Sequence, residues 1–195
     1  MQVKKGYLRG VRGVLLTQLN ADGSVPASPE KHWIDTAQSV SVEAQISEGE
    51  EAELRGGDKL LAKIEEDDVF TGVNLSFTDA RFDAKATELI AGGTLVYDDV
   101  NTDEIIGWEA PTVEEQGTKT PFKAEVFVQS FDQTGNREAY LKYDFRFAKG
   151  SPGSITHGDR EWGTPEFSLQ CKENPSTGES VYSRIFVDSL PPEAS

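Results

Sequence analysis

The chain has 195 residues, a mass of 21.4 kDa and a formal net charge of −15, from 19 basic and 34 acidic residues. A sequence pI near 4.5 argues against ordinary binding to a phosphate backbone, which requires a basic surface. The single cysteine, Cys171, excludes an internal disulfide and a multi-cysteine zinc site, and two histidines are too few for most histidine-rich metal sites.

The length and the apolar runs bound the organisation of the chain. One domain over residues 1–195 is expected, with a basic N-terminal arm at about 1–12 and a short C-terminal tail at about 189–195. No apolar run approaches the roughly 20 residues of a membrane span. The apolar stretch at residues 14–16 is too short for a signal peptide, so we expect a soluble product made in the cytoplasm.

The first half of the chain is patterned as a series of strands. An apolar-rich stretch at 11–19 predicts the first strand, and NADGS at 20–24 predicts a turn. In residues 40–46 apolar residues alternate with polar ones, which predicts a strand with one solvated face. Further strands are predicted at 52–54, 60–64 and 73–77. The polar sequence EGEE precedes the first of them, and EEDD separates the second from the third. The Gly-Gly pair at 56–57, between the first two, predicts a bulge or tight turn.

One segment differs from the strands around it. Over residues 79–93 the apolar side chains fall at helical spacing, in the order Phe82, Ala86, Leu89 and Ile90. Asp79 is the expected N-cap and Gly92 the expected C-terminal stop. This pattern predicts a helix of about three turns with an apolar stripe that lies on a sheet.

The second half returns to strand patterns after an acidic excursion at about 98–120 that has no firm periodicity. Strands are predicted at 95–97, 122–131, 143–147, 167–171 and 181–187, with a hairpin turn at 132–136 and a break at the Gly/Pro/Ser-rich residues 150–154. About eight to ten strands and one helix result. The predicted fold class is mainly β, a β-sandwich or partly closed barrel with one packed helix.

The charge is unevenly distributed along the chain. Residues 43–68 contain ten acidic and three basic residues, and residues 98–116 contain seven acidic residues and no basic one. The four basic residues Lys4, Lys5, Arg9 and Arg12 precede the first acid, Asp22. Solvated acidic loops need no function beyond solubility. The alternatives are a surface that repels a polyanion, or an acidic patch that meets the basic arm of a neighbouring copy.

No catalytic motif is evident, and the isolated candidates favour structural roles. Cys171 lies on the apolar side of an alternating run, which favours a buried structural thiol over a nucleophile. The pair His157 and Asp159 has no partnered Ser or Cys in a recognisable context. The sequence DDVNTDE at 98–104 lacks the spacing of a calcium loop, although a flexible acidic loop binds calcium weakly.

The aromatic residues and His32 favour an interface over a ligand site. The tryptophans at 33, 108 and 162 fall in predicted loops or strand ends. Exposed tryptophans favour an interface, with a sugar-stacking platform as the second interpretation. His32, next to Trp33, is expected at a surface or interface rather than as a ligand.

Three stretches give the chain a likeness to a known family. The opening KKGYLRGVRGVLLTQLNADGS resembles the start of a phage major tail protein, the subunit of the tail tube. AELRGGDKLLAKIEEDD followed by FTGVNLSFTDARFDAKATELIAGGTLVYD is similar to the core of that family, a long hairpin, a strand, one helix, GGT and a further strand. The likeness covers residues 4–98 and, less specifically, the strands from 122 to 187, while the second acidic stretch does not match.

The resemblance implies a virion structural protein, located in the tail, with no catalysis and no cofactor. Six subunits would form a ring, and rings would stack into a hollow tube through which DNA passes without specific binding. Its implied partners are copies of itself and other tail proteins, namely the tape measure, the tail terminator and the distal tail protein. The resemblance does not distinguish a flexible from a contractile tail.

Several residues are candidates for roles in such a tube. An acidic wall suits a channel that passes DNA, and the solvated face with Ser41, Glu43 and Gln45 is the expected lumen lining. The expected contacts between rings or subunits are a hairpin tip at Glu48, Glu50 and Glu51, a loop at Glu65, Glu66, Asp67 and Asp68, and the basic arm with Lys4, Lys5, Arg9 and Arg12. Some of the acids from Glu43 to Asp68, including Glu53, could instead face the lumen.

Two other classes of function remain open at this stage. A calcium- or carbohydrate-binding β-sandwich module would use the tryptophans and the acidic loops. A β-sandwich enzyme is the third class. Calcium-dependent melting would favour the module, and concentration-dependent rings or filaments would favour the self-assembling protein.

Overall fold

A computed structural model describes residues 4–115, 119–155 and 157–194, and these residues form a mainly β fold with one short α-helix. The strands of the main sheet are β1 (Tyr7–Gln18), β2 (Lys31–Ile34), β3 (Ala37–Ser47), β6 (Val69–Asp79), β9 (Phe122–Phe131), β10 (Arg137–Pro152), β11 (Glu166–Cys171) and β12 (Tyr182–Val187). Two separate hairpins are formed by β4 (Glu51–Gly56) with β5 (Lys59–Glu65), and by β7 (Thr94–Tyr97) with β8 (Ile105–Glu109). The predicted fold class is therefore confirmed.

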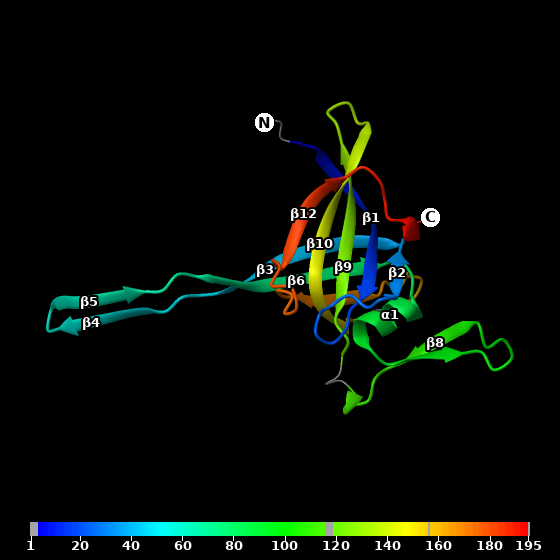
Figure 1. The fold of residues 1–195 in the computed structure, drawn as a ribbon, viewed down its shortest axis with the longest axis horizontal. Helices are drawn as coiled ribbons and strands as arrows, with labels where there is room; N and C mark the ends of the chain where they lie inside the picture. The colour runs from blue at the N-terminus through cyan, green and yellow to red at the C-terminus, as the bar shows by residue number, and fades with distance from the viewer. Residues whose placement is uncertain (1–3, 116–118, 156, 195) are drawn as a thin grey trace.

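The main sheet is antiparallel, in the order β2-β1-β9-β10-β11-β6-β3, and it bends along its longest strand, β10. The first half of β10 pairs with β12 and β9, and its end pairs with β11 at residues 148–152. The strands β3 and β6 therefore cross over β1, β9 and β10, as Figure 1 shows. The ladders of the described residues do not close into a barrel, because β3 pairs with β6 alone.

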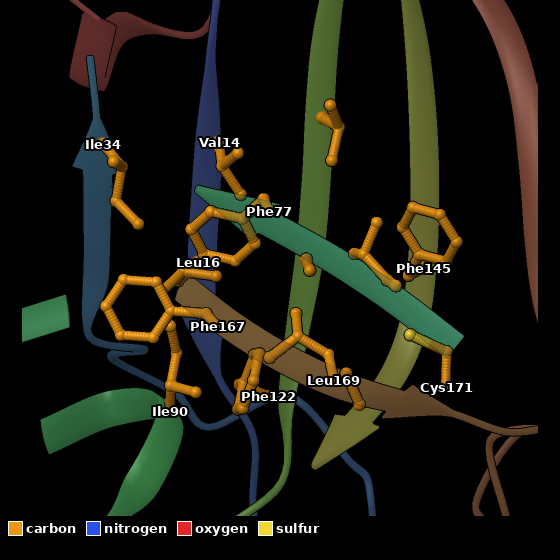
Figure 2. Close-up of a cluster of buried hydrophobic side chains, with 14 of the residues drawn as sticks. Val14, Leu16, Ile34, Phe77, Ile90, Phe122, Phe145, Phe167, Leu169 and Cys171 are labelled. Atoms are coloured by element: carbon orange, nitrogen blue, oxygen red, sulfur yellow. The ribbon is translucent and has the colours of Figure 1, made fainter. Parts of the chain in front are cut away.

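The core lies between the two crossing layers (Figure 2). Each strand contributes alternate side chains, such as Leu16 from β1, Phe77 from β6 and Leu169 from β11, each at most 1 % exposed. Phe77 stacks on Phe167 with ring centroids 5.0 Å apart. The alternation that identified these strands in the sequence is thus the alternation of core and surface positions.

The helix is shorter than predicted and begins later. Helix α1 (Ala84–Ala91) is capped by Asp83, whose carboxylate accepts hydrogen bonds from the backbone N–H groups of Lys85 and Ala86. Gly92 is the C-cap, as expected. Ala86 and Ile90 pack on the core, but Phe82 precedes the helix and is half exposed.

The prediction of Asp79 as the N-cap is wrong because Asp79 still belongs to β6. Its backbone pairs with Ala37, its N–H donates to the Pro165 carbonyl, and its side chain is buried against the Thr36 hydroxyl. Both aspartates precede helical spacing, so local chemistry alone does not choose between them.

Two further predictions about irregular segments are corrected. The Gly/Pro/Ser-rich residues from 150 were expected to break the chain, but β10 continues through Gly150 to Pro152 and pairs there with β11. Gly150 allows this close packing, since an added Cβ would lie 2.3 Å from Ile90 Cγ2. Within the acidic excursion, residues 105–109 are not irregular but form β8, paired with β7.

Candidate assembly surfaces

The solvated face of β3 belongs to a wide polar surface. Ser41 and Glu43 are exposed on it, and Gln45 is half-buried, donating from Nε2 to Asn74 Oδ1 at 2.6 Å. The register continues the surface across β6 and β11, where Ser76 pairs with Ser168. A shallow groove of about 580 Å³ crosses it, lined by Glu43, Asn74, Ser76, Lys119, Lys149, Gly150, Ser151, Ser168 and Gln170.

The charge of this polar face differs from the expected acidic wall. Among the groove residues Glu43 is the acid, and it is accompanied by Lys119 and Lys149. The other acids between residues 43 and 68 lie beyond this face, from the end of β3 to the start of β6. The face is therefore lined mainly by hydroxyl and amide groups.

The most prominent feature of the surface is the two-stranded arm formed by β4 and β5, which projects from the ends of β3 and β6 (Figure 1). Every residue from 50 to 70 is exposed. Cross-strand pairing puts Ala52 beside Ile64 and Leu54 beside Ala62, so these apolar side chains share one face.

The opposite face of the arm carries charge. Glu53 pairs with Lys63 in register, and ion pairs join Lys63 to Glu51 at 2.8 Å, Lys63 to Glu65 at 3.4 Å and Arg55 to Glu53 at 2.7 Å. The arm is thus amphipathic, with an apolar face that no other described part of the chain covers.

Two predicted acidic contact sites form one cluster at the base of the arm. Residues 48–51 were expected at a hairpin tip, but the tip is the turn at Gly57 and Asp58. Glu66 N–H donates to the Glu50 carbonyl at 3.1 Å, and Gly49 N–H donates to Asp68 Oδ1 at 3.1 Å, so the two acidic segments lie side by side. We call this cluster the acidic collar; it comprises Glu48, Glu50, Glu51, Glu65, Glu66, Asp67 and Asp68.

Two of the four basic residues expected in an N-terminal arm lie on β1, and the other two precede it. We call Lys4, Lys5, Arg9 and Arg12 the basic strip; all four are exposed, and Arg9 and Arg12 lie within the strand. Lys4 forms an ion pair with Asp188 at 3.2 Å. Exposed Tyr7 and Leu8 lie beside the strip. The pairing of β1 with β9 has two register shifts in this region. Such bulges are common at the edges of sheets, where they discourage pairing with other chains. Residues 1–3 of the predicted arm lie outside the described residues.

The β7–β8 hairpin is attached to the helix. Trp108 Nε1 donates to the Gly92 carbonyl at 2.8 Å, which ties β8 to the end of α1. Asp98 accepts hydrogen bonds from the N–H groups of Val100 and Asn101, and these bonds lower the pKa of its carboxyl. The residues DDVNTDE thus form a turn stabilised by Asp98.

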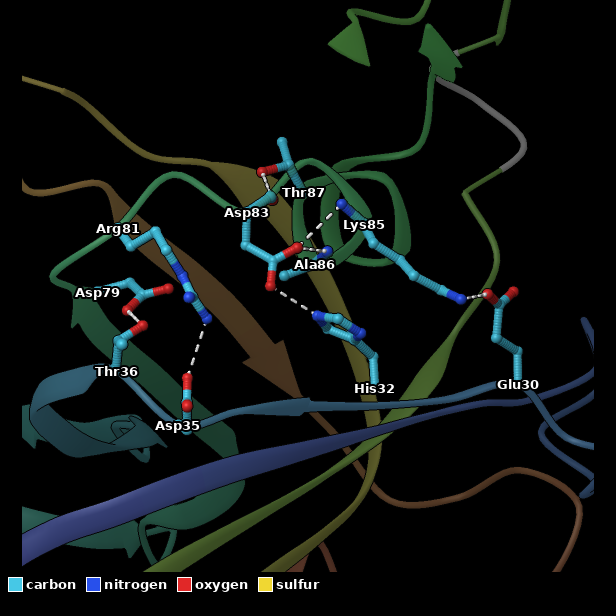
Figure 3. Close-up of polar contacts among 10 residues, drawn as sticks. All are labelled: Glu30, His32, Asp35, Thr36, Asp79, Arg81, Asp83, Lys85, Ala86 and Thr87. Carbon is cyan, nitrogen blue, oxygen red and sulfur yellow. Dashed lines mark hydrogen bonds and ion pairs between the residues drawn. The ribbon is translucent and has the colours of Figure 1, made fainter. Parts of the chain in front are cut away.

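The aromatic and histidine predictions have mixed outcomes. Trp33 is partly buried and lies edge-on to Phe127 at 5.7 Å, so two of the three tryptophans take part in intramolecular packing. Trp162 is 95 % exposed. His32 Nε2 lies 2.7 Å from Asp83 Oδ2, which links β2 to the N-terminus of α1 (Figure 3).

The candidates for chemistry remain isolated in the described residues. Cys171 is fully buried, and desolvation raises the pKa of its thiol to about 12, which suppresses the reactive thiolate. No group of three His, Cys, Asp or Glu side chains that could hold a metal ion is found in the ranges described. Among the helices described, none has the length and apolar composition of a membrane span.

Comparisons with known proteins identify no family for this chain. The sequence matches no family model and no curated protein sequence. Among solved structures it is similar to a chain of the cryo-EM structure of the anti-feeding prophage baseplate, symmetrised sixfold. The identity is 10 % and the TM-score 0.31, over 96 % of this chain and 98 % of that chain. A likeness of this size assigns no function to this chain.

Proposed function

We propose that the protein is a structural subunit of a phage-type tail, which assembles with copies of itself into stacked hexameric rings that form a hollow tube. The amphipathic β4–β5 arm carries this proposal. A two-stranded hairpin is marginally stable alone in water, and its exposed apolar face, with Leu54, Leu61 and Ile64 all more than half exposed, favours burial against another molecule.

Open strand edges support self-assembly as well. β2, β3 and β12 each have one edge that no other described strand pairs. Unpaired edges promote association with other chains, and ring closure removes them. Association of such edges head to tail between identical copies yields closed rings when the rotation closes.

The polar face supports a channel that does not retain DNA. In the proposed ring, Ser41, Glu43 and Gln45 line the lumen together with the hydroxyl and amide groups of β6 and β11. The hydroxyl and amide groups carry no charge, and the groove on this face contains one acid, Glu43, beside Lys119 and Lys149, so its net charge is small. DNA transits without specific binding, and the tape measure, terminator and distal tail proteins are the further proposed partners.

Charge complementarity supports stacking between subunits. The acidic collar and the basic strip are exposed and have opposite charge, an arrangement that steers association between copies. Replacing Glu65, Glu66, Asp67 and Asp68 together by lysine should therefore impair tube formation. A matched control replaces the exposed residues Asp99, Asp103, Glu109 and Glu114 by lysine, with the same change of net charge at and beside the β7–β8 hairpin and with Asp98 of its turn left in place.

The test is negative-stain electron microscopy of the purified protein and both variants over a concentration series. Rings or hollow tubes with sixfold end views for the wild type and the control, with loss of stacking in the collar variant, support the proposal. Normal tubes from the collar variant would remove the collar from stacking. Dispersed subunits from the wild type at every concentration, with or without a tail initiator, would refute self-assembly.

A further inference from the structure

The hydrophobic core has an opening on one side, along a seam between β1 and β3. On the β2 side, β1 is paired only at residues 14–17, and β3 is paired only with β6, so two open edges face each other across the seam. A cavity of about 360 Å³ lies there, lined by residues of β1, β3, β9 and β10 that include Arg9 and Gln38.

The apolar side chains around the seam are incompletely buried. Val11, Val40, Val42, Val128 and Tyr143 pack against the core but are only partly buried, and all five line the cavity. The floor of the seam is thus apolar, while Arg9 of the basic strip lies at its rim. A complementary occupant would be apolar toward the floor and acidic toward the rim.

The β4–β5 arm has this combination. Seven large hydrophobic side chains are exposed on the arm and its base, namely Ile46, Leu54, Leu60, Leu61, Ile64, Val69 and Phe70. The acidic collar flanks them at the base of the arm, whereas Glu53 lies on the opposite face. In one copy the arm points away from the body that contains the seam (Figure 1), so the arm can cover only the seam of another copy.

We propose that the apolar face of the β4–β5 arm of one copy docks over the β1–β3 seam of a second copy, with Arg9 of the second copy beside the acidic collar of the first. This contact rests on the proposed function and specifies which surfaces meet. It is heterologous, because the arm and the seam are different surfaces, so each copy offers one free arm and one free seam. Repetition of the contact in one direction builds a ring when the rotation closes and a stack when it does not.

The contact is tested by disulfide trapping between two singly substituted proteins. Leu54→Cys places a thiol on the apolar face of the arm, and Gln38→Cys places one on the exposed rim of the seam. The native Cys171 is buried and contributes no background. Under mild oxidation at assembling concentrations, the mixture should form disulfide dimers at least about tenfold faster than either protein alone. Glu53→Cys, on the charged face of the arm, is the matched control and should crosslink slowly with Gln38→Cys.

A second variant measures how much the apolar face contributes. Leu54→Asp should weaken the apparent association constant by about tenfold or more, from the loss of one buried leucine. Its thermal midpoint as a free subunit should not change, because Leu54 is 61 % exposed there. Glu53→Gln is the control variant and should assemble nearly as the wild type does.

The possible results distinguish a failure of this contact from a failure of the proposed function. Wild-type assembly, with no trapping between Leu54→Cys and Gln38→Cys and no effect of Leu54→Asp, overturns the arm–seam contact and leaves self-assembly standing. Faster trapping of Leu54→Cys with itself shows arm–arm pairing and also overturns the contact. A wild type that never associates refutes both proposals.

Discussion

Asp83 offers a sharp test of how the helix is held to the sheet, because one carboxylate performs two tasks. Its Oδ1 accepts hydrogen bonds from the N–H groups of Lys85 and Ala86 at 3.0 and 3.1 Å, and its Oδ2 contacts His32 Nε2 at 2.7 Å. The side chain is 16 % exposed, so solvent replaces these contacts poorly (Figure 3). Asp83→Ala removes both the cap and the link to β2.

The magnitude follows from adding the two losses. Loss of an N-cap costs about 1 kcal/mol, and loss of a partly buried hydrogen bond to a charged group costs about 1–2 kcal/mol. Asp83→Ala should therefore lower the free energy of unfolding by about 2–3 kcal/mol at pH 7. Asp83→Asn keeps a good cap and should lose only about 1 kcal/mol. The control Asp35→Ala breaks an exposed pair with Arg81 and should cost less than about 0.5 kcal/mol.

The dependence on pH gives an independent check. Burial alone would raise the pKa of Asp83, but the hydrogen bonds from His32 and the Ala86 amide lower it below its usual 3.8. A depressed pKa in the folded state stabilises the fold above pH 3.8, and this contribution is lost as the pH falls through the folded value. The wild type and Asp83→Asn should therefore converge in strongly acidic solution. Urea denaturation at several pH values measures the difference, and an Asp83→Ala loss no larger than that of Asp35→Ala would refute the reasoning.

Three other predictions concern the core. Gly150→Ala should destabilise the fold by about 1–3 kcal/mol in urea denaturation, because the added Cβ would lie 2.3 Å from Ile90 Cγ2; a neutral effect would mean that the helix shifts freely. Cys171, with its thiol pKa raised to about 12, should react with Ellman's reagent only after denaturation, and rapid reaction in the native protein would contradict its burial. Burial raises the pKa of Asp79, so its charged form costs stability as the pH rises. Asp79→Asn should add about 1 kcal/mol at pH 7, and this gain should vanish below pH 3.8; equal gains at both pH values would refute the cause.

The strands of the core were predictable from the sequence because burial there alternates with a period of two. Residues 73–77 and 167–171 show this pattern, and both lie in the core of the structure. The start of the helix was not predictable, because Asp79 and Asp83 are equivalent local signals. The choice is made by contacts remote in sequence, namely the pairing of Asp79 with Ala37 and the link of Asp83 to His32.

The arm shows a different limit of sequence-based prediction. The predicted strands at 52–54 and 60–64 are confirmed as β4 and β5, but both are exposed on both faces, so no alternation of burial indicates how they pair. The tight turn that the Gly-Gly pair allowed is present at Gly57, whose φ of +62° favours glycine. The prediction of a hairpin tip at residues 48–51 is wrong, because these residues lie at the base of the arm. Pairing Leu54 with Ala62 across that turn would have put residues 48–51 beside 65–68 and revealed the acidic collar.

The positions of the charges change the physical explanation of how the proposed tube would pass DNA. An acidic wall was expected, yet the acids of residues 48–68 lie on the arm and its base, and those of residues 98–109 lie on the β7–β8 hairpin. The polar face of β3, β6 and β11 offers Ser41, Ser76 and Ser168 with few charges, and Lys119 and Lys149 lie in the same groove as Glu43. In the proposed tube, DNA would therefore meet a nearly neutral, hydrated wall, and weak binding rather than repulsion would keep it moving. The excess negative charge would then serve the contacts between subunits, where the basic strip provides its complement.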